Sequence, residues 1–305
     1  MRDAFVDSLF DLALSDKNVV LLTADLGFGV FEKFEALSGQ FFNVGISEQN
    51  MIGLASGLAL LGKKIVVYSI GNFPTLRCLE QIRNDACYHN LNITIVSTGG
   101  GFSYGSLGMS HHATEDIAIM RALPNIIVIA PCTTDEAGKA ITQLIKAEGV
   151  SYLRLDKTSA ETMYIEDNFV IGKARRYREG SDITLITTGG ILYDVNIAAD
   201  KLKKIGISAR VIGMHSIKPI DKEEIIDAAI NTGGIVSIEE HNLDGGLGSA
   251  ISEVCMDQGV IPKVFSRIGL KDTYSSMVGS QQYLKSNYKM DSVAIVKEVK
   301  NRLNK

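Results

Sequence analysis

The segment SEQNMIGLASGLALLGKKIVVY, residues 47–68, joins a helix-forming run to a strand-forming run through Gly62, Lys63 and Lys64. Residues 51–61 carry no charge, which predicts a deeply buried helix over 47–61. The continuous apolar run at 65–68 is typical of a strand that is covered on both faces. Strands of this kind belong to parallel sheets between layers of helices, so we expect an α/β fold.

The same alternation extends from this segment toward both ends of the chain. It predicts strands at 19–24, 93–97, 126–130, 152–155, 183–187, 209–213, 235–239 and 262–266, and helices at 2–14, 76–89, 115–122, 134–147, 191–204, 221–230, 247–257 and 291–303. Residues 156–181 are polar and irregular between the two series. We therefore expect two doubly wound sheets: a larger parallel domain over 1–165, a linker at 166–181 and a smaller domain over 182–305.

Composition excludes several classes of protein. A chain of 305 residues with 46% hydrophobic residues can bury two cores, which excludes a disordered protein. Its 31 basic and 35 acidic residues give a net charge of −4, which argues against a nucleic-acid partner. No apolar run approaches the ~20 residues of a membrane span, and the N-terminus lacks the apolar core of a signal peptide. We expect a cytoplasmic protein without a membrane partner.

Glu48 is the first candidate functional residue. It stands in the first turn of the helix predicted over 47–61, directly after Ser47, which is placed as the N-cap. An acid in this position favours the helix dipole, and an acid beside a buried ligand can exchange a proton with it. The residues alone leave both interpretations open.

A second candidate lies in the sequence Gly108-Met-Ser-His111-His112, after a glycine-rich stretch. Adjacent side chains point in different directions on a helix or strand, so we expect at most one of these histidines to enter a site. Neither histidine has the spaced partners that a metal site would need. A histidine that faces solvent or bonds the backbone is the open alternative.

A series of motifs runs in order along nearly the whole chain. It consists of Thr23-Ala-Asp25-Leu26, Asn43-Val-Gly-Ile-Ser-Glu48, Phe73-x3-Arg77-x2-Glu80-Gln81, Gly108-x-Ser-His111, Arg121-Ala-Leu-Pro124-Asn125, Lys218-Pro219-Ile-Asp221 and Glu239-Glu240-His241 with Gly245-Gly246-Leu-Gly248. This series resembles the C-terminal half of transketolases, which comprises a pyrimidine-binding domain and a C-terminal domain. Each motif is modest alone, and it is their order that makes the resemblance specific.

The resemblance implies thiamine diphosphate as the cofactor. The family's glutamate at the Glu48 position hydrogen-bonds N1′ of the aminopyrimidine and shares a proton with it. Phe73 matches the aromatic residue that stacks on this ring, and Ile70 stands where a second wall is expected. Asp25 and Leu26 match a segment that touches the cofactor.

The resemblance also implies substrate-binding residues. His111 matches a histidine that contacts the sugar near the reacting carbons, Arg2 is in register with a phosphate ligand, and Lys157 stands where the family has an arginine. Other family residues are replaced: an acidic pair by Ser106 and Leu107, a phosphate-binding histidine by Gly99, and a serine at or near Gly29. These losses imply a non-standard acceptor sugar.

The diphosphate and Mg²⁺ site of the family requires a Gly-Asp-Gly sequence, which this chain does not contain. We therefore expect one subunit of a split transketolase that is active only with an N-terminal, diphosphate-binding partner subunit, in an α2β2 heterotetramer. The partner would supply the Mg²⁺ ligands, and no metal ligand is expected here. The implied reaction transfers a two-carbon ketol unit between sugars.

Three alternatives share this domain pair. The beta subunit of a 2-oxo acid dehydrogenase E1 component has the same site glutamate, but the motifs that contain His111 and Arg121 favour a transketolase. A 1-deoxyxylulose-phosphate synthase carries both halves in one chain. A non-catalytic scaffold subunit would need neither Glu48 nor Phe73.

Overall fold

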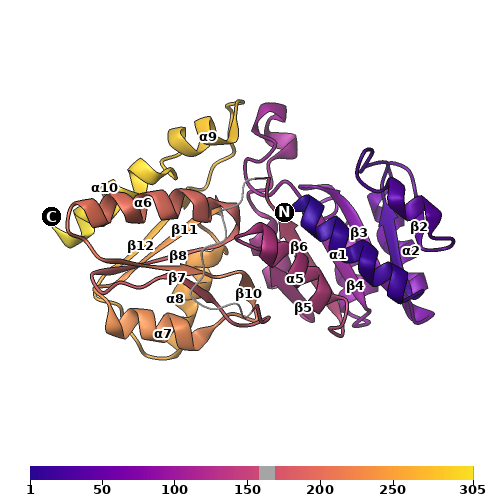
Figure 1. Cartoon of the computed structure of the whole chain (residues 1–305), viewed down its shortest axis with the longest axis horizontal. Coiled ribbons are helices and arrows are strands. Elements are labelled where there is room, and N and C mark those ends of the chain that lie inside the picture. The colour runs from indigo at the N-terminus through magenta and orange to yellow at the C-terminus, as the bar shows by residue number, and fades with distance from the viewer. Residues whose placement is uncertain (158–168, 305) are drawn as a thin grey trace.

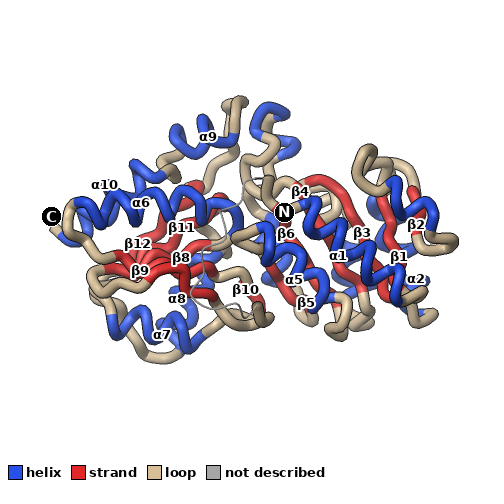
Figure 2. The backbone as a smooth tube through the Cα atoms, in the orientation of Figure 1, coloured by secondary structure: helices blue, strands red, loops and turns tan. Residues whose placement is uncertain are grey.

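The computed structural model describes residues 1–157 and 169–304 (Figure 1). Within these residues the chain forms two α/β domains that lie side by side, each with a sheet between helices (Figure 2). The fold class predicted from the alternation of strand and helix periods is therefore confirmed. Residues 158–168, which include the end of the expected first domain and the start of the expected linker at 166–181, lie outside the described residues.

In the described residues the first sheet has seven strands in the order β10-β5-β6-β4-β3-β1-β2. All neighbours are parallel except β10, which is antiparallel to β5. The strands are β1 (Val19–Thr23), β2 (Phe41–Asn43), β3 (Lys64–Ile70), β4 (Ile93–Thr98), β5 (Ile126–Ile129), β6 (Val150–Leu155) and β10 (Ser216–Lys218). Helices α1 (Arg2–Ser15) and α5 (Thr134–Leu144) pack together on one face. The other face carries α2 (Glu48–Leu60), α3 (Leu79–Gln81) with the π-helix Ile82–Cys87, and α4 (Asp116–Ala122).

The second sheet, as far as the chain is described, has five strands in the order β12-β11-β8-β9-β7. Its strands are β7 (Arg175–Arg178), β8 (Ile183–Thr187), β9 (Ala209–Gly213), β11 (Ile235–Asn242) and β12 (Phe265–Leu270). Helices α6 (Leu192–Lys204) and α10 (Ser292–Leu303) pack together on one face, and α7 (Lys222–Asn231) and α8 (Leu247–Asp257) pack together on the other. A short helix, α9 (Gln281–Asn287), precedes α10.

Several element boundaries differ from the predicted ones. The helix expected over 76–89 begins only at Leu79, after a series of turns. The strand expected at 262–266 runs instead over Phe265–Leu270, and Pro262, which has no N–H for a strand ladder, lies before it. Arg175–Arg178, in the segment expected to be irregular, pairs with β9 as the antiparallel edge strand β7. The short polar helix α9 had no signal in the hydrophobic pattern.

The outer face of α2 corrects the expectation of a deeply buried helix. Its inner face belongs to the core, but its outer face is open: Leu54, Leu60 and Leu61 are 39%, 69% and 80% exposed. Gly53 and Gly57 on the same face have only open space where a side chain would stand. The apolar surface of an uncharged helix has to be buried against other residues, but the sequence of the helix does not say whether these belong to the same chain.

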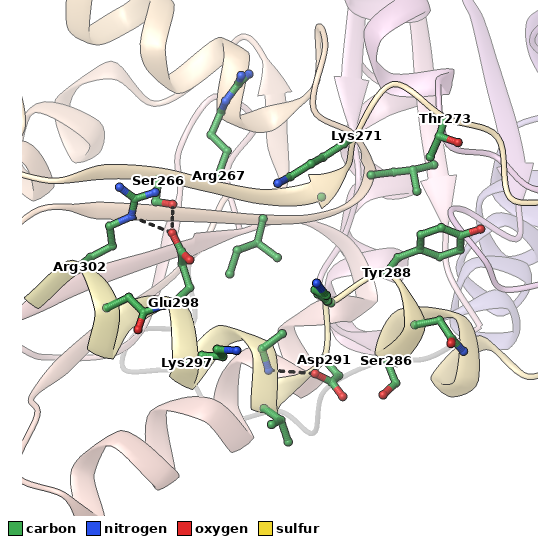
Figure 3. Close-up of a pocket in the computed structure, with 18 residues that line it drawn as sticks. Ser266, Arg267, Lys271, Thr273, Ser286, Tyr288, Asp291, Lys297, Glu298 and Arg302 are labelled. Carbon is green, nitrogen blue, oxygen red and sulfur yellow. Dashed lines mark hydrogen bonds and ion pairs between the residues drawn. The ribbon is translucent and has the colours of Figure 1, made fainter. Parts of the chain in front are cut away.

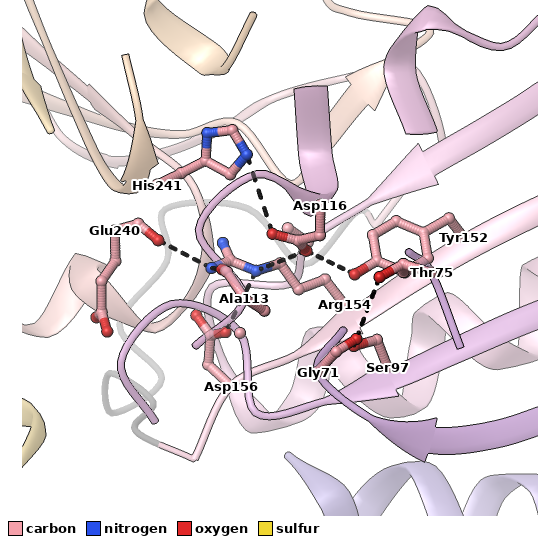
Figure 4. Close-up of polar contacts among 12 residues, drawn as sticks. Gly71, Thr75, Ser97, Ala113, Asp116, Tyr152, Arg154, Asp156, Glu240 and His241 are labelled. Atoms are coloured by element: carbon pink, nitrogen blue, oxygen red, sulfur yellow. Dashed lines mark hydrogen bonds and ion pairs between the residues drawn. The ribbon is translucent and has the colours of Figure 1, made fainter. Parts of the chain in front are cut away.

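Contacts between the domains include a shared strand and a buried polar cluster. β10 comes from the second half of the chain and extends the first sheet at β5. The buried polar cluster is centred on Arg154 (Figure 4). The Arg154 guanidinium is 1% exposed, lies 3.2 Å from Asp116 and 3.8 Å from Asp156, and donates to the Glu240 carbonyl at 2.9 Å. The loop that leads to the candidate site is anchored in this cluster, because Arg154 also donates to the Ala113 carbonyl.

Candidate active site

The candidate residues gather where parallel strands end. β1, β2, β3 and β4 are neighbours in one sheet, so the segments that follow them meet at its carboxyl edge. Asp25 and Leu26 follow β1, Glu48 follows β2, Phe73 follows β3, and the loop with His111 follows β4. Residues from four separate motifs are thereby brought to one edge.

Glu48 is a buried carboxylate with a cationic partner. It is the first residue of α2 and is 1% exposed. Ser47 occupies the N-cap position as predicted, but its side chain makes no capping hydrogen bond. The Glu48 carboxylate instead accepts a hydrogen bond from Arg77 at 2.6 Å, and the Arg77 side chain is 43% exposed. The buried charge is thus balanced from the solvent side of the site.

Arg77 and Phe73 together connect Glu48 to the histidine loop. The Phe73 amide bonds the carbonyl of Ile70 at 2.9 Å, in the turn that leaves β3. The Arg77 guanidinium lies 4.5 Å from the centre of the half-buried Phe73 ring, and the His111 ring meets the same ring edge-on at 5.3 Å. Ile70 is half-buried at the strand end. Glu48, Arg77, Phe73 and His111 form one continuous cluster, which we call the Glu48 cluster.

The two adjacent histidines point to different surroundings. His111 is half-buried, contacts Phe73, and its Nδ1 lies 3.0 Å from the Ser110 hydroxyl. His112 is buried edge-on against Phe102, and burial lowers its pKa. The expectation that only one of the pair faces the candidate site agrees with this geometry.

Asn43 ties the ends of β1 and β2 together. Its side-chain oxygen accepts from the Asp25 amide at 2.9 Å and from the Gly45 amide at 3.0 Å. Asp25 has a left-handed backbone with φ of 55°, which aspartate tolerates better than most residues. Asn43 belongs to one of the ordered motifs, but the motif alone assigned it no role. Its position between two strand ends could be recognised only with the sheet order in hand.

Arg2 and Lys157 lie apart from the Glu48 cluster, around Tyr104. The Lys157 ammonium is 3.7 Å from the centre of the Tyr104 ring. Partial burial lowers the pKa of Lys157, and the nearby Arg2 cation lowers it further. Arg2 itself pairs with Asp3 at 3.0 Å. We call Arg2, Lys157 and Tyr104 the cation pair site. Tyr104 was missed because none of the ordered motifs contains it.

A separate cavity of about 830 Å³ lies in the second domain, between β12 and α10 (Figure 3). Lys271, Lys289 and Lys297 line it, and Glu298 on its wall bonds Ser266 and Arg302. None of the predicted site residues lines this cavity.

The described residues contain neither a metal-binding cluster nor a membrane span. Within residues 1–157 and 169–304, no group of three or more His, Cys, Asp and Glu side chains is arranged to hold a metal ion. In the same part of the chain, no helix combines the length and apolar character needed to cross a membrane.

Comparison with known proteins identifies the family of the chain. Residues 1–162 match the pyrimidine-binding domain of transketolase, and residues 172–295 match the transketolase C-terminal domain. The chain belongs to the transketolase family. The resemblance inferred from the ordered motifs is therefore confirmed, and the chain corresponds to the C-terminal half of the family.

Similar transketolase proteins include separate subunits. The chain is 35% identical over 302 residues to an apulose-4-phosphate transketolase subunit of Phocaeicola vulgatus, covering 97% of this chain and 95% of that protein. It is 37% identical over 310 residues to a putative transketolase C-terminal section of Methanocaldococcus jannaschii (100% and 96% covered). It is 34% identical over 310 residues to a 6-deoxy-6-sulfo-D-fructose transketolase subunit of a Clostridium species (100% and 95% covered).

A solved structure gives the same fold. It is described as a split-gene transketolase in an inactive beta4 tetramer, and it is 33% identical with a TM-score of 0.88. The match covers 99% of this chain and 97% of that one. These relatives support a transketolase-type enzyme part, whereas the roles of single residues remain predictions.

Proposed function

We propose that this chain is the pyrimidine-binding subunit of a split, thiamine diphosphate-dependent transketolase that transfers a two-carbon ketol unit between sugars. The Glu48 cluster is the observation that carries the proposal. It combines a buried carboxylate, a half-buried aromatic ring and a histidine at the carboxyl edge of one sheet. A structural acid in a helix first turn would need neither the ring nor the histidine beside it.

The cluster fits one end of thiamine diphosphate. An aminopyrimidine presents a flat face, an N–H donor and a ring nitrogen, and the cluster offers Phe73 for the face and Glu48 for the nitrogen. The diphosphate end needs a metal ion, and the described residues hold no group of acids suited to one. Because the cluster fits only the pyrimidine end of the cofactor, this arrangement supports a second subunit that binds the diphosphate and Mg²⁺.

The predicted site residues at this sheet edge have distinct roles in this proposal. Glu48 would hold a proton at N1′ of the pyrimidine, because a carboxyl group removed from water is well placed to share a proton with a ring nitrogen. Phe73 and Ile70 would orient the ring, and Asp25 and Leu26 would contact it from the side of β1. The bound cofactor would supply a nucleophilic carbon that can carry a two-carbon unit. His111 would donate a hydrogen bond to a sugar oxygen near the reacting carbons.

The open face of α2 is the proposed docking surface for the partner. It runs along α2 from the helix end that carries the buried Glu48, through Gly53 and Gly57 to Leu61, so a subunit docked on it would also lie beside the Glu48 cluster. Glycines on an exposed helix face allow a second backbone to approach closely, and the leucines supply apolar area. The relatives named as separate subunits support a partner for this chain as well. We propose an α2β2 assembly.

The cation pair site supports an anionic sugar as substrate. Arg2 and Lys157 are two cations at the same sheet edge, and they would hold a charged group at the far end of a sugar. Leu107, which is 54% exposed, stands where the family has an acid that reads a substrate hydroxyl. We therefore propose a substrate with an anionic end but a hydroxyl pattern unlike that of the common pentose phosphates.

Reconstitution tests this function. The chain is mixed with its diphosphate-binding partner, thiamine diphosphate and Mg²⁺, and ketol transfer is followed with a panel of anionic sugars. We expect Glu48→Gln to lower kcat by at least a hundredfold, and Glu35→Gln, an exposed acid in the same domain, to leave it unchanged. A Glu48→Gln complex with the full rate would refute the proposal. Ordinary turnover of ribose 5-phosphate with xylulose 5-phosphate would refute the non-standard acceptor alone.

A further inference from the structure

We propose, on the basis of the function proposed above, that Arg77 is a placeholder for the aminopyrimidine ring of the cofactor. Before the cofactor binds, its guanidinium fills the place of that ring between Glu48 and Phe73. It has to leave when the cofactor binds. Arg77 stands in one of the ordered motifs, but the predicted site residues did not include it.

One planar group makes both contacts that the cofactor ring needs. The Arg77 guanidinium donates to the Glu48 carboxylate at 2.6 Å and lies 4.5 Å from the centre of the Phe73 ring. A guanidinium is flat, carries N–H donors and stacks on aromatic faces. An aminopyrimidine is also flat, meets a carboxyl through nitrogen and stacks on an aromatic ring. Glu48 and Phe73 cannot offer the same surfaces to both groups at once.

Arg77 is placed to move without any change in the fold. Its side chain is 43% exposed, whereas Glu48 is 1% exposed, so the solvent side is open to it. It lies in the turns between β3 and α3, outside both elements. In the described part of the chain, its side chain forms an ion pair with Glu48 and a cation–π contact with Phe73. Rotation of this long side chain is therefore sufficient to release the site.

The placeholder explains how the subunit keeps a buried carboxylate before the cofactor binds. A buried charge without a partner strongly destabilises a folded protein. The buried Cys78 thiol beside Glu48 stays neutral, since burial raises its pKa to about 12 and Glu48 raises it as well, and a thiol carries no positive charge in either form. Arg77 supplies the missing cation. The cofactor must then displace Arg77, which lowers its apparent affinity.

Two variants of Arg77 test this exchange through cofactor binding. The dissociation constant of thiamine diphosphate is measured by calorimetry on the reconstituted complex with Mg²⁺. We expect Arg77→Ala to bind the cofactor on the order of tenfold more tightly than wild type, because no ion pair has to be broken. Arg77→Lys keeps the charge but loses the planar stack on Phe73, so its dissociation constant for the cofactor should lie between those of wild type and Arg77→Ala. Arg83→Ala is the matched control, because Arg83 is exposed and bonds only Asn84 among the described side chains.

A second measurement uses this chain alone. Saturation-transfer NMR with 4-amino-2,5-dimethylpyrimidine should give a stronger signal with Arg77→Ala than with wild type, and none with Phe73→Ala. If Arg77→Ala bound the cofactor no more tightly than wild type and Glu48→Gln still abolished turnover, the placeholder role of Arg77 would be wrong and the proposed function would stand. If Glu48→Gln also bound cofactor and turned over normally, the proposed function itself would fail.

Discussion

The ring of Tyr104 fills the space above Gly99. A Cβ added at Gly99 would lie 2.1 Å from the Tyr104 ring, and the Gly99 backbone has a left-handed φ of +90°. The histidine that the family resemblance places at this position therefore cannot fit here. Tyr104 occupies its space and carries Lys157 on its face at 3.7 Å.

Removal of Lys157 should weaken binding of an anionic sugar. We predict that Lys157→Ala raises KM on the order of tenfold and changes kcat little, because the ammonium would contact the charged end of the sugar and not the reacting carbons. Tyr104→Leu should raise KM less, since it removes the cation–π contact but leaves the Lys157 ammonium in place. Steady-state kinetics of the reconstituted enzyme measure both. Lys63→Ala, before β3 at the opposite edge of the sheet, is the control, and an unchanged KM in Lys157→Ala would contradict the assignment.

Glu240 should make stability depend on pH. Burial raises its pKa to about 7, above the ordinary 4.5, although Gln281 and the Phe102 amide bond the carboxylate. The folded state then binds more protons than the unfolded state between about pH 4.5 and 7, so the free energy of unfolding falls as pH rises through this window.

The difference between wild type and Glu240→Gln isolates this effect. Buried His215 and His241 act in the opposite direction, because burial lowers their pKa and their contribution is lost as pH falls below 6.5. The free energy of unfolding is measured with urea at about pH 5, 6, 7 and 8. From the lowest to the highest pH, wild type should lose a few kcal/mol more than the variant, since one pKa unit corresponds to about 1.4 kcal/mol. Parallel stability curves for the two proteins would exclude the titration of Glu240.

Arg154 should be the most sensitive contact between the domains. Arg154→Met leaves Asp116 and Asp156 buried without their cation, and we predict a loss of about 3–5 kcal/mol in the free energy of unfolding. Arg178→Ala breaks an exposed pair with Asp200 and should lower it by less than ~1 kcal/mol. Denaturant unfolding measures both, and equal effects would show that the buried cluster does not hold the domains together.

The outer face of α2 should govern assembly. Gly57→Gln places a long side chain on this face, and we predict at least a tenfold rise in the dissociation constant for the diphosphate-binding partner. Circular dichroism of the isolated variant should be unchanged, because glutamine forms helix better than glycine by ~0.5–1 kcal/mol. Ile230→Gln, on an exposed apolar position of α7, is the matched control. Sedimentation velocity would exclude α2 as the docking surface if Gly57→Gln assembled as tightly as this control.

The two sheets could be predicted from the sequence because continuous apolar strands and helical periods are local signals. The motifs also singled out Glu48, Phe73 and His111, and the structure brings them together at one sheet edge. Arg77 and Tyr104 received no role, because their contacts join segments that are far apart along the chain. The helix α2 was expected to be deeply buried, since the hydrophobic pattern of a core helix and of an interface helix is the same.

The most direct test of the central claim is a titration with thiamine diphosphate in the presence of Mg²⁺. It is carried out on this chain alone, on its partner alone and on their mixture, and it is repeated with the Glu48→Gln variant of this chain. The account predicts tight binding and ketol transfer only in the wild-type mixture, because the two ends of the cofactor are held by different subunits. Full ketol transfer by this chain alone, or by the Glu48→Gln mixture, would contradict it.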